Sequence, residues 1–169
     1  MARPETSLAE SVCLALVVSG ADYGGAVAEL LAPGAELGHI WTLSKPLTYR
    51  AIDALVAREL LDRAGTAPGR GGDRRLLEPT RRGRSATRRW LAEPVGHLRD
   101  VRTELLLKFR ILERLDESLV PLARAQRELF EPMIGVITSS AADDVVSRWR
   151  REHARAVAGF LDAVIDAAP

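Results

Sequence analysis

Hydrophobic positions in the first 60 residues are spaced as in α-helices. The run from Ser7 to Ser19 is apolar on all sides, and Ser7 followed by Glu10 is the pattern of a capping box. A shorter helical pattern follows and ends at Pro33-Gly34. A third lies within residues 43–60, with Ser44 as its predicted cap and an inward face predicted to hold Leu47, Ile52, Leu55 and Val56.

The outward side of the third helix is polar in its first two turns. We expect it to present Lys45, Thr48, Tyr49 and Arg50 to solvent. Asp53, one turn beyond Tyr49, is expected to orient Arg50 or Lys45. Two helices, a connection and a third helix with a polar N-terminal face are typical of a helix-turn-helix domain.

A hairpin and a basic helix are predicted next. Residues 60–64 and 75–79 have the pattern of short strands, and the segment TAPGRGGD between them has the Gly and Pro content of a hairpin tip. A hairpin directly after such a helix is a wing. The following helix, with Trp90 and Leu91 inward, is interrupted at Pro94 and Gly96. We therefore predict a winged helix-turn-helix domain at residues 1–94 and a second domain at residues 95–169.

The second domain is predicted to be entirely helical. A seam of apolar residues runs through its first helix, Asp116 is expected to cap the next one, and Pro132 is expected to kink or end it. Asp143 or Asp144 is expected to start the last helix, with one apolar side made of Val145, Trp149, Val157, Phe160, Leu161 and Val164. Such seams need partners, most simply from a second copy, so the predicted fold is mainly α with a C-terminal α-helical dimerisation domain.

Charge is unevenly distributed along the chain. The net charge is only +1, but residues 58–90 contain ten Arg against four acidic residues, an excess of six. A local basic patch is the electrostatic footprint of nucleic-acid binding. The alternative reading is a solvated surface with surplus arginine.

With these residues in place, the chain resembles the PadR family of transcriptional regulators, in particular its longer members with a helical C-terminal extension. The matching stretches cover nearly the whole chain: LGHIWTLSKPLTYRAIDALVARELL, GRGGDRRLLEPTRRGR through WLAEPV, RTELLLKF, and RWRREHARAVAGFLD. The resemblance implies a dimeric winged-helix DNA-binding protein, usually a repressor, that responds to small hydrophobic, often aromatic or cationic, compounds. Many relatives have an aromatic residue after the glycine that starts the second helix, whereas here Tyr23 precedes Gly24-Gly25.

The resemblance also assigns DNA-binding roles to single residues. In the third helix they are Ser44, Lys45, Thr48, Tyr49 and Arg50, and in the wing they are Arg70, Arg74 and Arg75. The chemistry agrees, because a major groove about 12 Å wide admits one helix. Lys45 and Arg50 are expected to meet phosphates or guanine, Tyr49 a phosphate, and Thr48 a phosphate or a thymine methyl. Arg70, among glycines at the tip, is suited to the minor groove.

Other function classes receive less support from the sequence. The three His are scattered and the single cysteine, Cys13, lies in an apolar run, so we expect no catalytic centre, no metal site and no cofactor. No signal peptide or membrane span is predicted, so we expect a cytoplasmic protein. A pseudo-palindromic operator, a homodimer and release by an effector are expected, with Trp149 and His153 as candidate effector contacts. Two alternatives stay open: a protein-interaction module that uses the C-terminal helices, and an activator or effector-independent regulator.

Overall fold

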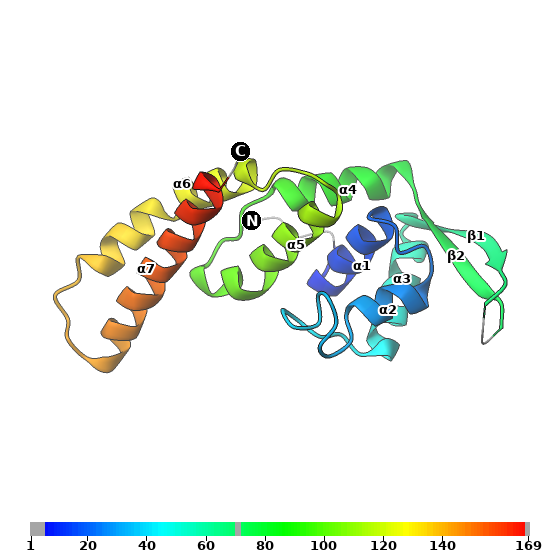
Figure 1. Ribbon diagram of the computed structural model, residues 1–169, viewed down its shortest axis with the longest axis horizontal. Helices are drawn as coiled ribbons and strands as arrows, with labels where there is room; N and C mark the ends of the chain where they lie inside the picture. The colour runs from blue at the N-terminus through cyan, green and yellow to red at the C-terminus, as the bar shows by residue number, and fades with distance from the viewer. Residues whose placement is uncertain (1–5, 70–71, 168–169) are drawn as a thin grey trace. The chain divides into compact units, whose positions relative to one another are not determined.

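The computed structural model describes residues 6–69 and 72–167, which form a mainly helical chain with one two-stranded antiparallel sheet (Figure 1). The chain divides into two compact units, Met1–Leu91 and Ala92–Pro169. The predicted fold class, mainly α with a hairpin wing and C-terminal helices, is confirmed. None of the described helices is both long enough and apolar enough to cross a membrane.

Three helices build the core of the N-terminal unit: α1 (Leu8–Val18), α2 (Gly24–Leu30) and α3 (Lys45–Ala57). The predicted capping box is confirmed, because the Glu10 amide donates to Ser7 Oγ at 3.3 Å and the Ser7 amide to Glu10 Oε2 at 2.8 Å. The α1 helix is buried along most of its length. Its Cys13 is fully buried, and this burial raises the pKa of the thiol to about 12, so Cys13 is a core side chain.

Strands β1 (Leu61–Ala67) and β2 (Arg74–Pro79) form the predicted hairpin, and both are longer than expected. Leu61 pairs with Pro79 at its root, and the register shifts between Arg63 and Thr66. Gly65 lies in this bulge with a φ of 105°, a backbone conformation that residues with a Cβ rarely adopt. The segment before α2 joins the sheet, since the Leu77 amide donates to the Asp22 carbonyl at 2.8 Å. Three helices followed by this hairpin constitute a winged helix.

Helix α4 (Arg81–Ala92) begins at the root of the hairpin. Thr80 caps it: its hydroxyl accepts a hydrogen bond from the Gly83 amide at 3.0 Å and donates to the Glu59 carbonyl at 2.8 Å. Gly83 approaches the backbone so closely that a Cβ there would lie 2.1 Å from the Leu60 carbonyl oxygen. The α4 helix is therefore held tightly against the start of β1.

The C-terminal unit begins with a 3-10 turn (Leu98–Asp100) and a π-helical turn (Val101–Leu105) that lead into α5 (Leu106–Arg114). Helices α6 (Val120–Thr138) and α7 (Val145–Asp166) then lie side by side (Figure 1). Asp144 caps α7 as predicted, and the hydrogen bonds that it accepts from Ser147 lower the pKa of its carboxyl group.

Two expectations about where these helices begin and end are wrong. Asp116 does not cap α6: it has a φ of 54° just after α5, where the Glu117 amide donates to the Leu112 carbonyl. This is the left-handed geometry that ends a helix. Pro132 does not end α6, since the helix continues to Thr138 with the proline on its exposed side. The alternative, that Pro132 kinks this helix, stays a prediction.

Polar side chains inside the C-terminal unit hold the segment after α4. Gln126 accepts from the Val95 amide at 2.7 Å and donates to the Val95 carbonyl at 2.9 Å, both buried. Lys108 is also buried, and its ammonium donates to the Glu93 carbonyl at 2.7 Å and pairs with Glu104 at 3.0 Å. Burial lowers the pKa of Lys108, and the nearby Glu104 carboxylate opposes that shift. These contacts satisfy the backbone groups of a segment that has no secondary structure of its own.

The apolar side predicted for the last helix is only partly buried. Val157 and Leu161 are buried against the rest of the unit, whereas Val145 and Trp149 are exposed, Trp149 by 68%. Phe160 is partly exposed and its ring lies 6.0 Å from that of Phe109. At 3.6 residues per turn the six apolar residues lie within one arc of about 160°, so they share one side of the helix, and packing covers only the edge of that arc that carries Val157 and Leu161.

Candidate nucleic-acid interface

The N-terminal half of α3 presents a polar surface to solvent. Ser44, Lys45, Tyr49 and Arg50 are exposed, with Tyr49 43% accessible. Ser44 has the extended backbone of a cap but its side chain makes no capping hydrogen bond, so its hydroxyl remains available. Lys45 and Arg50 form no ion pair with any described residue. This end of the helix therefore offers two cations and two hydroxyl groups to a ligand.

Thr48 does not belong to that surface, which corrects the sequence prediction. Its side chain is fully buried, and its hydroxyl donates to the Ser44 carbonyl at 3.1 Å. Leu47, which was predicted to be inward, is 49% exposed instead. The buried positions of α3 are Thr48, Ala51, Ile52 and Leu55, a spacing of three, four and seven residues that defines one face of the helix.

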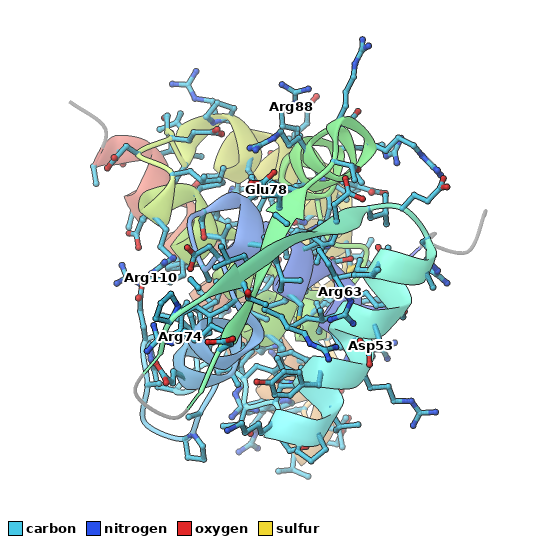
Figure 2. All side chains as sticks on the ribbon, turned by 90° about the vertical axis from the view of Figure 1, so that its right-hand side faces the viewer. Asp53, Arg63, Arg74, Glu78, Arg88 and Arg110 are labelled. Atoms are coloured by element: carbon cyan, nitrogen blue, oxygen red, sulfur yellow. The ribbon has the colours of Figure 1, made fainter. Side chains whose placement is uncertain are left out.

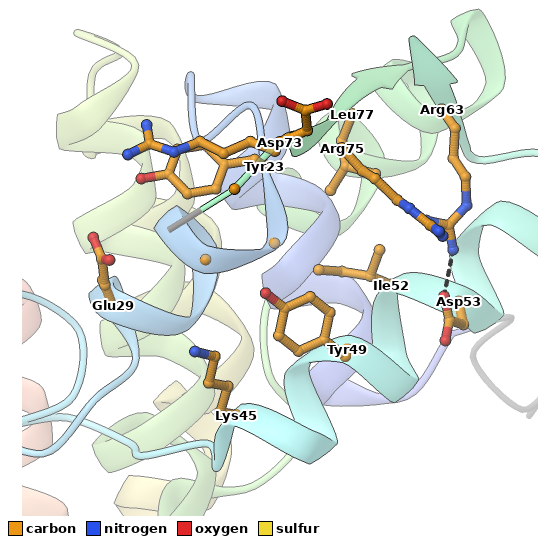
Figure 3. A pocket seen from close by; sticks show the side chains of 14 residues that line it. Tyr23, Glu29, Lys45, Tyr49, Ile52, Asp53, Arg63, Asp73, Arg75 and Leu77 are labelled. Carbon is orange, nitrogen blue, oxygen red and sulfur yellow. Dashed lines mark hydrogen bonds and ion pairs between the residues drawn. The ribbon is translucent and has the colours of Figure 1, made fainter. Parts of the chain in front are cut away.

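A cleft of about 640 Å³ separates α3 from the hairpin (Figure 3). Tyr49 lies on its floor, and its ring approaches α2 so closely that a Cβ on Gly24 would be 2.6 Å from the ring. The glycine at the start of α2 therefore makes room for the tyrosine. The lining residues are Tyr23, Gly24, Gly25, Glu29, Lys45, Tyr49, Ile52, Asp53, Arg63, Gly72, Asp73, Arg74, Arg75 and Leu77.

Two contacts fix the hairpin relative to the helices. Arg63 of β1 pairs with Asp53 of α3 at 2.6 Å (Figures 2 and 3). The Arg74 guanidinium of β2 lies 4.5 Å from the centre of the Tyr23 ring. The expectation that Asp53 orients Arg50 or Lys45 is therefore wrong. Because the Asp53–Arg63 pair is largely exposed, it directs side chains more than it adds stability.

Arg75 is a second arginine of the hairpin that extends toward α3, beside Arg63. Figure 3 shows its side chain extending toward the Arg63–Asp53 pair, and it has no ion pair of its own among the described residues. One carboxylate thus faces two guanidinium groups, which leaves positive charge at this wall of the cleft. Arg70, also predicted to bind DNA, lies outside the described residues.

The first turns of α4 extend the basic surface. Arg81, Arg82 and Arg84 are all exposed, and Arg82 pairs with Glu59 at 3.1 Å. On the described part of the chain, no group of three His, Cys, Asp or Glu side chains is placed to hold a metal ion.

The two candidate effector residues lie together in the C-terminal unit. The ring of Trp149 stacks on that of His153, with centroids 5.7 Å apart and planes 11° from parallel. A small cavity of about 140 Å³ in this unit is lined by Val136, Ile137, Ser140, Ser147 and Arg150 and by neither candidate. Their role in effector binding stays a prediction.

Three residues of the interface were not assigned to it from the sequence. The sequence predicts Arg63 only as a residue of the first strand. Successive side chains of a strand point to opposite faces, and this alternation is the signal that could place Arg63 on the face toward α3. Tyr23 was noted only as a departure from the family pattern. Leu47 was placed in the core, although its spacing from Arg50 and Ala54 is that of an outer face.

The fold has likenesses among solved structures. The chain is similar to a solved structure described as Bacillus subtilis PadR in complex with operator DNA, with a TM-score of 0.48 and 15% sequence identity over 92% of this chain and 97% of that chain. No family model matches the chain, and no curated protein matches it.

Proposed function

We propose that this protein is a transcriptional regulator that binds duplex DNA by placing α3 in the major groove. The observation that carries the proposal is the exposed N-terminal half of α3, where Lys45, Tyr49 and Arg50 stand beside a hairpin rich in arginine. A groove about 12 Å wide accepts a single helix, and side chains near the N-terminus of that helix reach the base edges. The sequence resemblance to PadR regulators agrees with this role.

The two sides of α3 are assigned different contacts with the DNA. Lys45 and Tyr49 line the cleft together with Arg75, so in the proposed complex they hold a phosphate of the DNA backbone. Arg50 lies outside the cleft, on the outer surface of the helix, and is assigned to a base edge. Arg74, which stacks on Tyr23, has its place set by the ring and contacts the backbone from there.

A DNA titration tests the proposal. Fluorescence anisotropy would measure the Kd for a labelled duplex from upstream of the protein's own gene and for a scrambled duplex, at several salt concentrations. We expect tighter binding to the first duplex. For each phosphate contacted, the logarithm of the association constant should fall by about 0.9 for every tenfold rise in salt concentration. Arg75→Ala should reduce that slope by about one unit, whereas Arg124→Ala, the same change at an exposed position on α6, should leave it unchanged. Binding that is absent, or independent of salt, would refute the proposal.

We further propose that residues 1–94 bind DNA and that residues 95–169 form a homodimer. Helix α6 exposes Leu129, Met133 and Val136, which share one side of the helix at spacings of four and seven residues. Helix α7 of the same unit exposes Trp149. Exposed apolar stripes of this kind are usually covered by another protein surface. A two-fold dimer would set the two α3 helices about 34 Å apart on a pseudo-palindromic operator.

Sedimentation measurements test the dimer directly. The unmodified protein should sediment as a dimer at micromolar concentration, and Met133→Glu or Trp149→Glu should shift it to a monomer. Arg124→Glu on α6 is the matched control, because it adds a carboxylate outside the stripe. If both stripe variants remain dimers, the interface lies elsewhere.

Repression and release by a hydrophobic or aromatic effector complete the proposed function. A reporter gene behind the bound promoter, measured with and without the regulator and then with a panel of aromatic compounds, separates a repressor from an activator. The second candidate function is a protein-interaction module, which the exposed stripes of α6 and α7 favour. A protein that associates with other proteins through these stripes but shifts no DNA duplex would be such a module.

A further inference from the structure

Leu47 is an exposed leucine in the first turn of the helix that is proposed to bind DNA. It is 49% accessible, whereas the core face of α3 consists of Thr48, Ala51, Ile52 and Leu55. The packing of the N-terminal unit therefore does not explain a large apolar side chain at this position. Its neighbour on the helix surface, Arg50, is a cation that repels other cationic proteins and attracts phosphates.

The side of α3 that carries Leu47 differs from the side that faces the cleft. Lys45, Tyr49 and Asp53 line the cleft, and neither Leu47 nor Arg50 does. Leu47 and Arg50 are three residues apart, so their side chains are neighbours on the helix surface. Ala54 continues the same stripe with a side chain too small to shield Leu47. An apolar contact thus lies next to the arginine that we assign to a base edge.

We propose that Leu47 reads a thymine by packing against its C5-methyl group, next to the base pair contacted by Arg50. The thymine methyl is the apolar group that base edges present in the major groove, and apolar side chains are its usual partners. The sequence assigned this contact to Thr48, which is buried and hydrogen-bonded to Ser44. The inference rests on the proposed function, since it requires α3 to enter the major groove.

The size of the effect follows from the area that one methyl group buries. Burying a methyl-sized group contributes roughly 0.8 kcal/mol, which corresponds to about a fourfold change in Kd. When both half-sites of a symmetric operator are changed, the two effects multiply to about 15-fold. Changes of this size are well resolved in a titration at fixed salt.

Replacing thymine by uracil in the DNA removes the methyl group and nothing else. A tight-binding duplex would first be selected from a random library with the unmodified protein. Each thymine would then be replaced by uracil, symmetrically in both half-sites, and the ratio of the two Kd values measured. We expect one thymine, beside a guanine, at which the ratio is about 15 for the unmodified protein and close to one for Leu47→Ala. Leu47→Met, which keeps an apolar side chain of similar size, should retain most of the ratio.

A matched control truncates an exposed side chain of α6 that lies outside the apolar stripe. Arg124→Ala should keep the full uracil ratio, because it leaves both Leu47 and the proposed dimer surface unchanged. Melting temperatures of the Leu47 variants should stay near that of the unmodified protein, because surface substitutions usually change the free energy of unfolding by less than about 0.5 kcal/mol.

The outcomes separate this inference from the proposed function. If the selected duplex shows no uracil effect at any thymine, or if Leu47→Ala shows the same ratio as the unmodified protein, Leu47 is not the reader and the proposed DNA binding still stands. If no duplex is enriched at all, the proposed function itself is wrong.

Discussion

Replacing Gly83 by alanine should disturb both the fold and the DNA surface, because this glycine sets how closely α4 packs on the root of the wing. A Cβ at this position would lie 2.1 Å from the Leu60 carbonyl oxygen and 3.2 Å from a Leu14 methyl carbon. Ordinary carbon–oxygen contacts are at about 3.3 Å or more, so helix and carbonyl would have to separate by roughly 1 Å. The obstacle is backbone, which cannot rotate away as a flexible side chain would.

The change in the free energy of unfolding is the sum of two destabilising contributions and one stabilising contribution. Forcing an extra carbon into a packed contact costs about 1–3 kcal/mol. The Leu60 carbonyl also accepts the Thr80 amide at 3.2 Å, and weakening that bond adds up to about 1 kcal/mol. The better helix propensity of alanine returns up to about 1 kcal/mol. We therefore expect Gly83→Ala to lower the free energy of unfolding by about 1–3 kcal/mol.

Urea denaturation followed by circular dichroism would measure this loss, with Gly135→Ala as the matched control. Gly135 is also helical, but apart from its chain neighbours and the adjacent backbone of α6 nothing lies within 4 Å of a Cβ built there, so alanine should stabilise α6 by about 0.5–1 kcal/mol. Gly83→Ala should also weaken DNA binding, because the wing starts at Leu61 and moves with Leu60. A Gly83→Ala protein as stable as the unmodified one would refute this account of the α4 contact.

Three further predictions concern residues whose roles the structure separates. Thr48→Val should change DNA affinity less than twofold and cost at most about 1 kcal/mol of stability, because the hydroxyl bonds only to Ser44; a large loss of binding at unchanged stability would contradict its buried placement. Arg50→Ala should cost about 1–3 kcal/mol of binding to the operator and relax the preference at one base pair, and an equal loss on scrambled DNA would instead make Arg50 a backbone contact. A pKa raised to about 12 leaves roughly one part in ten thousand of Cys13 as thiolate at pH 8, so a thiol reagent should label it only after denaturation, and labelling of the folded protein within minutes would contradict its burial.

The sequence alone located most of the local structure. The capping box at Ser7, the position of the hairpin and the cap of α7 at Asp144 all depend on residues within a few positions of one another. Short-range hydrogen bonds and turn geometry decide such features, and the residue types reveal them directly. The basic N-terminal face of α3 was visible for the same reason, because helical spacing places neighbours in sequence on a common surface.

Tertiary packing decided which side chains that surface contains. A rotation of α3 by one residue position exchanges Leu47 and Thr48 between core and solvent, and only the fit against α1 and α2 selects the observed phase. Asp53 found its partner in Arg63 because the hairpin folds back beside α3, a contact between residues on separate elements. Packing likewise decided which part of the apolar side of α7 is buried: Val157 and Leu161 are covered, whereas Val145 and Trp149 stay exposed. Burial depends on what packs against a residue, so a local pattern predicts the existence of a face more reliably than its exact members.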